Sequence, residues 1–159
     1  MGQDRRIELC KDICSEKRGV TPEVLQEVIF LAVEIAREGR EGRKIGTLFT
    51  VGDHEAVLQR SRCLILDPLE GHPEEVKHVN DVDMRETTKE LAQLDGGFVV
   101  TNYGVVQSAA RYISASAEVM NLPLGLGSRH VAAASVTQET DCVAVVVSES
   151  SMVRVFDDG

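Results

Sequence analysis

Four consecutive residues, Gly127-Ser128-Arg129-His130, combine backbone and side chains suited to binding a phosphate group. They open a run of small, helix-compatible residues, and the free N–H groups at a helix N-terminus bind anions. Arg129 would add a planar fork that matches phosphate, and His130 would add a hydrogen-bond donor or a metal ligand. The segment could equally be an ordinary helix N-cap followed by two surface residues. Cationic side chains oppose the helix dipole at this position, which mildly favours a bound anion.

A second segment, Asp95-Gly96-Gly97, lies directly before the apolar run "FVV". A carboxylate at the start of a buried strand, with open backbone around it, could hold a divalent metal ion or polarise a hydroxyl group. The alternative is a plain turn, because Asp-Gly is a favoured turn dipeptide. Taken alone, each segment favours the plain structural interpretation.

Taken together, the two segments resemble the motifs of the diadenylate cyclase (DAC) domain family. The family's hallmarks are an Asp-Gly-Ala motif and a Gly-Thr-Arg-His-Arg motif, which correspond here to residues 95–97 and 127–131. The framework agrees: "GTLFTVGD" and "LILDPLEGH" resemble the family's first strands, "AQLDG" its usual lead-in to the aspartate, and "VVVSES" its Val-Val-Ser-Glu strand end. The resemblance runs from about Ile45 to Phe156.

The resemblance implies an enzyme that joins two ATP molecules into cyclic di-AMP and releases two pyrophosphates, assisted by Mg²⁺ or Mn²⁺. Each 3′-hydroxyl attacks the α-phosphate of the other nucleotide, which requires in-line positioning and charge neutralisation. It implies catalytic roles for Asp95, Arg129 and His130, and metal binding by Asp95 and His130. Two apolar members of the implied site, Leu94 and Ile113, could equally be plain core. The implied nucleotide contacts are Leu94, Gly96, Gly97, Ile113, Gly127, Ser128, Ser148 and Glu149.

Two positions depart from the family pattern. Gly97 replaces the usual alanine, which we expect to loosen the turn while keeping the carboxylate. Val131 replaces the second arginine and removes one phosphate contact, unless a nearby cation such as Arg111 supplies the charge. If that arginine is indispensable, the chain would instead be a non-catalytic module of the same fold that binds ATP or cyclic di-AMP or serves oligomerisation. A third alternative is an unrelated phosphate-binding α/β protein in which the two motifs coincide by chance.

The symmetry of the product constrains the assembly. Cyclic di-AMP has two-fold symmetry, and one domain of this size holds one ATP. We therefore expect a homodimer or higher homo-oligomer in which two copies face each other about a two-fold axis.

Composition limits the other partners of the chain. A formal net charge of -9 disfavours binding to nucleic acid or to an anionic membrane surface, because both require a field of Lys and Arg. No segment has the roughly 20 apolar residues that span a bilayer, and "MGQDRRIELCKD" lacks the apolar core of a signal peptide, so we expect a cytoplasmic protein. The four scattered cysteines, Cys10, Cys14, Cys63 and Cys142, indicate reduced thiols rather than a disulfide scaffold.

The sequence predicts a polar N-terminal lead-in over residues 1–20 and a single domain over residues 21–159, which contains all the candidate site residues. Aliphatic side chains must form its core, because 43% of the residues are hydrophobic but only 4% are aromatic. We predict an α/β fold, a three-layer domain with a central mixed β-sheet flanked by helices. Helices are predicted from Thr21 and Pro22 to residue 35, near 54–60, over 82–94 with Val82, Leu91 and Leu94 on one side, and over 128–138. Extended segments are predicted at 45–53, 63–67, 95–106 as a hairpin, 142–148 and 152–156, whereas 107–121 carries no clear pattern.

Overall fold

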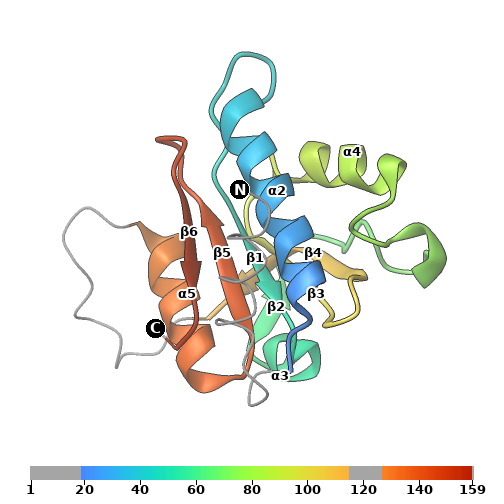
Figure 1. Ribbon diagram of the computed structural model, residues 1–159, viewed down its shortest axis with the longest axis vertical. Helices are drawn as coiled ribbons and strands as arrows, with labels where there is room; N and C mark the ends of the chain where they lie inside the picture. Colours follow the sequence, from blue (N-terminus) through green and yellow to red (C-terminus); the bar gives the residue numbers. More distant parts are fainter. Residues whose placement is uncertain (1–18, 115–126, 159) are drawn as a thin grey trace.

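The computed structural model describes residues 19–114 and 127–158 (Figure 1). Residues 1–18, which include Cys10 and Cys14, lie outside these ranges, as do residues 115–126 and 159. The helices are α2 (Pro22–Glu38), α3 (His54–Gln59), the 3-10 helix η1 (Glu74–Val76), α4 (Val82–Leu91) and α5 (Ser128–Glu139). The strands are β1 (Thr47–Val51), β2 (Ser61–Cys63), β3 (Gly97–Val100), β4 (Val106–Ile113), β5 (Val143–Val147) and β6 (Val153–Phe156).

The six strands form one mixed sheet in the order β2-β4-β3-β1-β5-β6. Only β1 and β3 run parallel, and all the other neighbouring pairs are antiparallel. The hydrophobic pattern predicted such a mixed sheet, and this prediction is confirmed.

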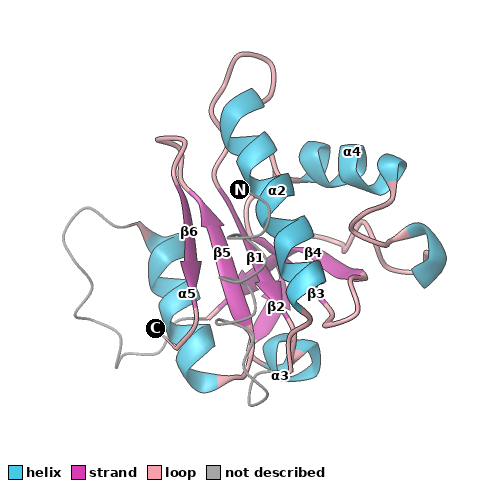
Figure 2. Ribbon diagram, in the orientation of Figure 1, coloured by secondary structure: helices cyan, strands magenta, loops and turns pink. Residues whose placement is uncertain are grey.

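Two separate cores cover the two faces of the sheet, which makes the domain three-layered (Figure 2). On one face α2 packs across β1, β5 and β6, and alternate strand residues such as Phe49 and Val145 belong to its core. On the other face Leu48 and Val146 pack with α5 and α3. Because both faces are covered, β5 is buried at every position, as its β-branched run predicts.

The predicted apolar face of α4 is wrong for Val82 and Leu94, whereas Leu91 packs against the core as expected. Val82 is 76% exposed and Leu94 is 37% exposed, whereas Met84, Thr88 and Lys89 are the buried positions of this helix. Met84 and Ala92 belong to the core and Leu91 packs against it, and ion pairs add to these contacts: Glu34 of α2 lies 2.8 Å from Arg85 Nη2 and 2.9 Å from Lys89 Nζ.

This cluster stays charged over a wide pH range. Burial alone would raise the pKa of Glu34, but hydrogen bonds from Lys89 and Arg85 bring that pKa below its usual value. Burial alone would lower the pKa of Lys89, but hydrogen bonds from Glu34 and Glu38 raise it. The network therefore links α4 to α2 through charge, in addition to the apolar packing of α4 against the core.

The segment without a sequence pattern contains the long strand β4. Its pairing with β3 shifts register between Gly97 and Val100, and Ala110 has a φ of 55°. This irregularity breaks the period-two alternation, which explains why the sequence gave no clear signal. The segment predicted to be extended at 63–67 pairs with β4 only at Cys63, the last residue of β2.

The described ranges contain no helix with the length and apolar character that crossing a membrane would require.

Candidate active site

One end of the sheet gathers the segments that carry the predicted site. Thr47, at the start of β1, pairs with Val147 at the end of β5, and Gly97, at the start of β3, pairs with Arg111 near the end of β4. Because β1 and β3 are parallel, both begin at this end. Helix α5 packs against β5 and brings its N-terminus to the same place. Sheet topology therefore places residues 95–97 beside residues 128–129.

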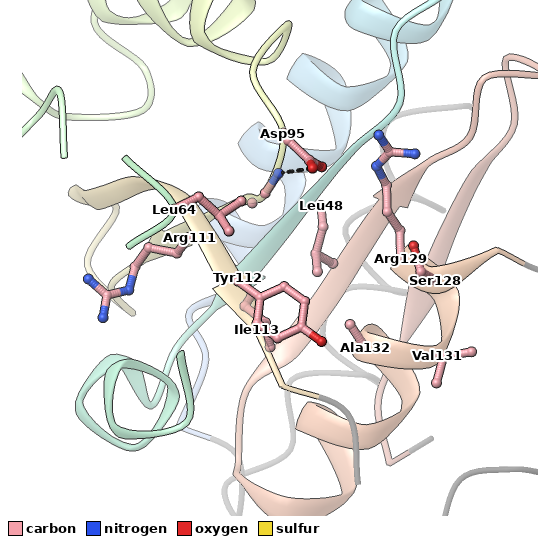
Figure 3. A pocket seen from close by; sticks show the side chains of 12 residues that line it. Leu48, Leu64, Asp95, Arg111, Tyr112, Ile113, Ser128, Arg129, Val131 and Ala132 are labelled. Atoms are coloured by element: carbon pink, nitrogen blue, oxygen red, sulfur yellow. Dashed lines mark hydrogen bonds between the residues drawn. The ribbon is translucent and has the colours of Figure 1, made fainter. Parts of the chain in front are cut away.

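A pocket of about 350 Å³ lies at this end of the sheet (Figure 3). Its polar wall contains Asp95 on one side and Ser128 and Arg129 on the other. Apolar side chains form most of the remaining wall. The lining residues are Leu48, Leu64, Asp95, Gly96, Gly97, Arg111, Tyr112, Ile113, Ser128, Arg129, Val131 and Ala132.

The Asp95 carboxylate is presented by a tight turn. Its Oδ1 accepts a hydrogen bond from the backbone N–H of Gly96 at 3.0 Å, which holds the side chain over the turn. Gly96 has a φ of 95°, and a Cβ there would lie 2.8 Å from the backbone of Ala110, so only glycine fits. The second carboxylate oxygen makes no hydrogen bond to any described residue and remains available to a ligand.

The N-terminus of α5 faces the carboxylate with unused donors. Gly127 is the N-cap residue, and it provides no side-chain hydrogen bond to the first turn. Ser128 is the first helical residue rather than the cap itself. A first turn without a capping side chain leaves N–H groups free for an anion.

Arg129 extends from this turn along the rim of the pocket, toward Asp95 in Figure 3. Its Nη1 lies 3.9 Å from Glu149 Oε1, a loose ion pair whose carboxylate is 71% exposed. A Cβ on Gly46 would lie 2.7 Å from the same nitrogen, so this glycine leaves room for the guanidinium. Gly46 was not among the residues expected from the sequence, and its place before a strand gave no signal for this role.

The structure does not bring the His130 ring into the pocket. His130 is 6% exposed, its ring lies 6.1 Å from that of Phe156, and neither ring nitrogen has a hydrogen-bond partner in the described residues. Burial lowers the pKa of His130, and the positive charges of Arg154 and Arg129 lower it further. The imidazole is therefore neutral at pH 7.

This burial predicts a pH-dependent stability. The unfolded chain protonates His130 near pH 6.5, whereas the folded chain resists protonation to lower pH, so the unfolded state binds more protons in between. We expect the free energy of unfolding to fall as the pH drops below about 6.5. Urea titrations of the native protein and of His130→Phe over pH 5–8 test this. The variant should show a flatter profile, and parallel profiles would contradict the prediction.

Four other expected residues do not line the pocket: Leu94, Gly127, Ser148 and Glu149. Ser148 closes the β5–β6 turn, where its hydroxyl accepts a hydrogen bond from Met152 N at 3.2 Å. Leu94 and Gly127 are adjacent to lining residues, and Ile113 lines the pocket as expected. The sequence did not point to Leu48, Leu64 or Tyr112, which form much of the apolar wall.

Arg111 does not supply the charge missing at Val131. Val131 lines the pocket, but the Arg111 guanidinium points away from it in Figure 3. Its Nε donates to Ser61 Oγ at 2.8 Å, and its Nη2 donates to the carbonyls of Leu58 and Ser61. The guanidinium is therefore held by Leu58 of α3 and Ser61 of β2 and is not turned toward Val131.

Gly97 has a packing role that the sequence did not indicate. A Cβ at this position would lie 2.8 Å from the carbonyl oxygen of Leu48 and 3.3 Å from its Cβ, because β1 and β3 approach closely here. We expect Gly97→Ala to lower the free energy of unfolding by about 1–3 kcal/mol, the usual cost of overpacking. Urea denaturation measures this loss, and an unchanged midpoint and slope would show that the strands separate without cost.

The donor set around the pocket fits a divalent ion that is held mainly by phosphate. Mg²⁺ typically binds one or two carboxylates together with substrate phosphates and waters. The free oxygen of Asp95 provides such a ligand. No group of three or more His, Cys, Asp or Glu side chains capable of holding a metal occurs in the described part of the chain, so the protein alone does not form a closed metal cage.

The fold and the pocket define an α/β domain suited to a ligand that carries phosphate groups. A sequence model of the family described as "DisA bacterial checkpoint controller nucleotide-binding" (DAC) matches residues 34–159. The chain belongs to this family, which confirms the resemblance seen in residues 95–97 and 127–131.

Two curated relatives carry the name diadenylate cyclase. That of Methanocaldococcus jannaschii is 47% identical over 136 residues, which cover 85% of this chain and 43% of the relative. That of Haloferax volcanii is 40% identical over 139 residues, which cover 87% of this chain and 51% of the relative. The chain thus spans about half the length of the curated relatives it matches.

Two solved structures share the fold at low sequence identity. A hypothetical membrane spanning protein from Bacillus cereus aligns with a TM-score of 0.62 and 20% identity, over 86% of this chain and 61% of that one. DacA from Staphylococcus aureus aligns with a TM-score of 0.56 and 19% identity, over 86% of this chain and 83% of that one.

Proposed function

We propose that residues 21–159 form a diadenylate cyclase domain, a nucleotidyltransferase that joins two ATP molecules into cyclic di-AMP. In each half-reaction, the 3′-oxygen of one ATP forms a bond to the α-phosphorus of the other, and the bond from that phosphorus to the pyrophosphate breaks. Two such steps release two pyrophosphates and two protons. The observation that carries the proposal is that Asp95 and the uncapped N-terminus of α5, with Arg129, line the same pocket.

The residues of the pocket fit distinct parts of ATP. The free N–H groups at Ser128 and the guanidinium of Arg129 would bind the triphosphate, because both donate to phosphate oxygens. The apolar side chains of Leu48, Tyr112 and Ile113 would contact the adenine ring. The free oxygen of Asp95 would accept the proton of the 3′-hydroxyl or hold the metal ion. Bound Mg²⁺ or Mn²⁺ would neutralise phosphate charge during the transfer.

His130 would act differently from the other motif residues. Its buried ring supports the first turn of α5 from the side opposite the pocket. In this conformation it would position Ser128 and Arg129 rather than bind phosphate or metal.

Catalysis would require two copies of the domain. One pocket of this size suits one nucleotide, and the reaction consumes two. An apolar rim beside the pocket suits such a contact: Leu64 lines the pocket, and the neighbouring Ile65 and Leu66 are 51% and 93% exposed.

The dimer predicts a concentration-dependent rate. With saturating ATP and Mn²⁺, cyclic di-AMP formed per subunit should rise with protein concentration and then level off. Leu66→Glu should shift that rise to higher concentration, because a charge replaces apolar contact, and should leave ATP affinity unchanged. A rate per subunit that is constant over a range in which light scattering shows a monomer would contradict the shared site.

A second function is favoured by Val131 and by the direction of Arg111. With one family arginine replaced and no substitute cation from Arg111, the domain would bind ATP or cyclic di-AMP without turnover. Chromatography of the products after incubation with ATP and Mn²⁺ separates the two functions. Product formation supports the cyclase, and tight ATP binding without product supports the binding module.

Because ATP is a cytoplasmic nucleotide, either function would place the domain in the cytoplasm.

A further inference from the structure

A second cavity, of about 280 Å³, lies beside β4. Arg111 is the one residue common to the linings of the two cavities. The residues that line the second cavity are Leu58, Cys63, Asp67, Glu70, Gly71, Lys77, Gln107, Ser108 and Arg111.

Lys77 gives this cavity a buried positive charge. The residue is 5% exposed, and its ammonium donates to the carbonyl of Leu69 at 3.5 Å. No carboxylate oxygen among the described residues lies within ion-pair distance of it. A buried ammonium without a counter-ion is costly, and a bound anion would remove that cost.

Arg111 supplies a second cation to the same cavity. Its Nη1 lies 3.2 Å from Cys63 Sγ and 3.4 Å from Ser108 Oγ, and its other donors reach a hydroxyl and two carbonyls. All of these partners are neutral. The guanidinium is thus oriented by hydrogen bonds but makes no ion pair with a described residue.

The two carboxylates of the lining are accounted for by other partners. Asp67 accepts hydrogen bonds from the backbone N–H groups of Leu69 and Ala109 and from the hydroxyl of Ser108. Those donors compensate its charge and hold it in the wall. Glu70 is exposed to water, which screens its charge.

We propose that this cavity binds a small oxyanion of the phosphate class between Lys77 and Arg111. The ammonium would donate charge-assisted hydrogen bonds and the side chain of Gln107 would add a neutral donor, whereas the guanidinium, whose five N–H groups already have partners, would add positive charge. Two anions share this chemistry: orthophosphate, and the pyrophosphate that the proposed reaction releases. The binding itself depends only on the cavity and is independent of the proposed function.

Calorimetric titration of the whole chain with each anion, at constant ionic strength, tests the site. We expect saturable binding that weakens at least about tenfold in Lys77→Gln and is retained in Lys77→Arg. Lys44→Gln removes an exposed lysine outside both cavities and serves as the matched control, with a change below about twofold. The anion that binds more tightly identifies the natural ligand as orthophosphate or as the pyrophosphate that the proposed reaction releases.

The nucleotide pocket also offers donors to phosphate, so the titration is repeated with Arg129→Ala. Binding at the second cavity should survive this change, whereas binding at the nucleotide pocket should not. If Lys77→Gln fails to fold, amide shifts of the native protein give the answer. Shifts at residues 77, 107 and 108 support the proposal, and shifts confined to residues 127–131 overturn it. Absence of saturable binding, or equal binding by native protein and a folded Lys77→Gln, would also overturn it.

Discussion

Replacing Asp95 with asparagine is expected to reduce cyclic di-AMP formation by at least about a hundredfold, the usual contribution of a positioned acid–base group. Asparagine has nearly the same size, and its side-chain oxygen can still accept the N–H of Gly96, so the turn should keep its shape. The variant loses the negative charge that would accept the hydroxyl proton or hold the metal ion. ATP affinity should change little, because Arg129 and the start of α5 provide the phosphate contacts.

Two measurements distinguish a specific loss of cyclic di-AMP formation from a general loss of folded protein. Product is quantified by chromatography, and ATP binding is measured by calorimetry under the same conditions. Asp157→Asn removes an exposed carboxylate that does not line the pocket, and this control should keep full activity. Full activity in Asp95→Asn would remove this residue from the mechanism.

Arg129→Ala is expected to weaken ATP binding by about 1.5–3 kcal/mol, or roughly 10- to 150-fold, if its guanidinium makes a charge-assisted bond to phosphate. The geometry favours a large value, since the only carboxylate within ion-pair distance of the guanidinium among the described residues is Glu149, at 3.9 Å and mostly exposed. The guanidinium is therefore free to pair with a ligand.

An exposed arginine elsewhere provides the comparison. Arg60 pairs with Glu139 at 3.1 Å on the surface, and Arg60→Ala should leave ATP affinity unchanged. If Arg129→Ala also binds ATP like the native protein, the first turn of α5 is an ordinary helix start and the triphosphate lies elsewhere.

The parts of this site that the sequence predicted are those encoded by local motifs. Asp95-Gly96-Gly97 and Gly127-Ser128-Arg129 each form a turn or a helix start within a few residues, so their types and order were informative. The wall formed by Leu48 and Tyr112 was not predicted. Leu48 lies within a strand buried on both faces, and Tyr112 follows the irregular backbone at Ala110, so neither has a diagnostic pattern.

The direction of the His130 side chain could not be read from the motif either. Successive residues of an α-helix point about 100° apart, so neighbours in the sequence face different sides. Ser128, Val131 and Ala132 share one face of α5 and line the pocket, whereas His130 lies on the opposite side. The face of α4 was mispredicted for another reason, because Thr88 and Lys89, which are polar, share its buried side with Met84.

The ion pairs between α4 and α2 also decide how the pocket responds to acid. Helix α4 ends at Leu91, four residues before Asp95, so the joint through Glu34 and Lys89 supports the carboxylate wall. The pKa values of Glu34 and Lys89 move apart, and both groups keep their charge well into mild acid. The opposite wall depends on His130, which destabilises the fold once protonated. We therefore expect mild acid to destabilise the fold through His130 beside the first turn of α5, while the ion pairs that support the Asp95 wall keep their charge.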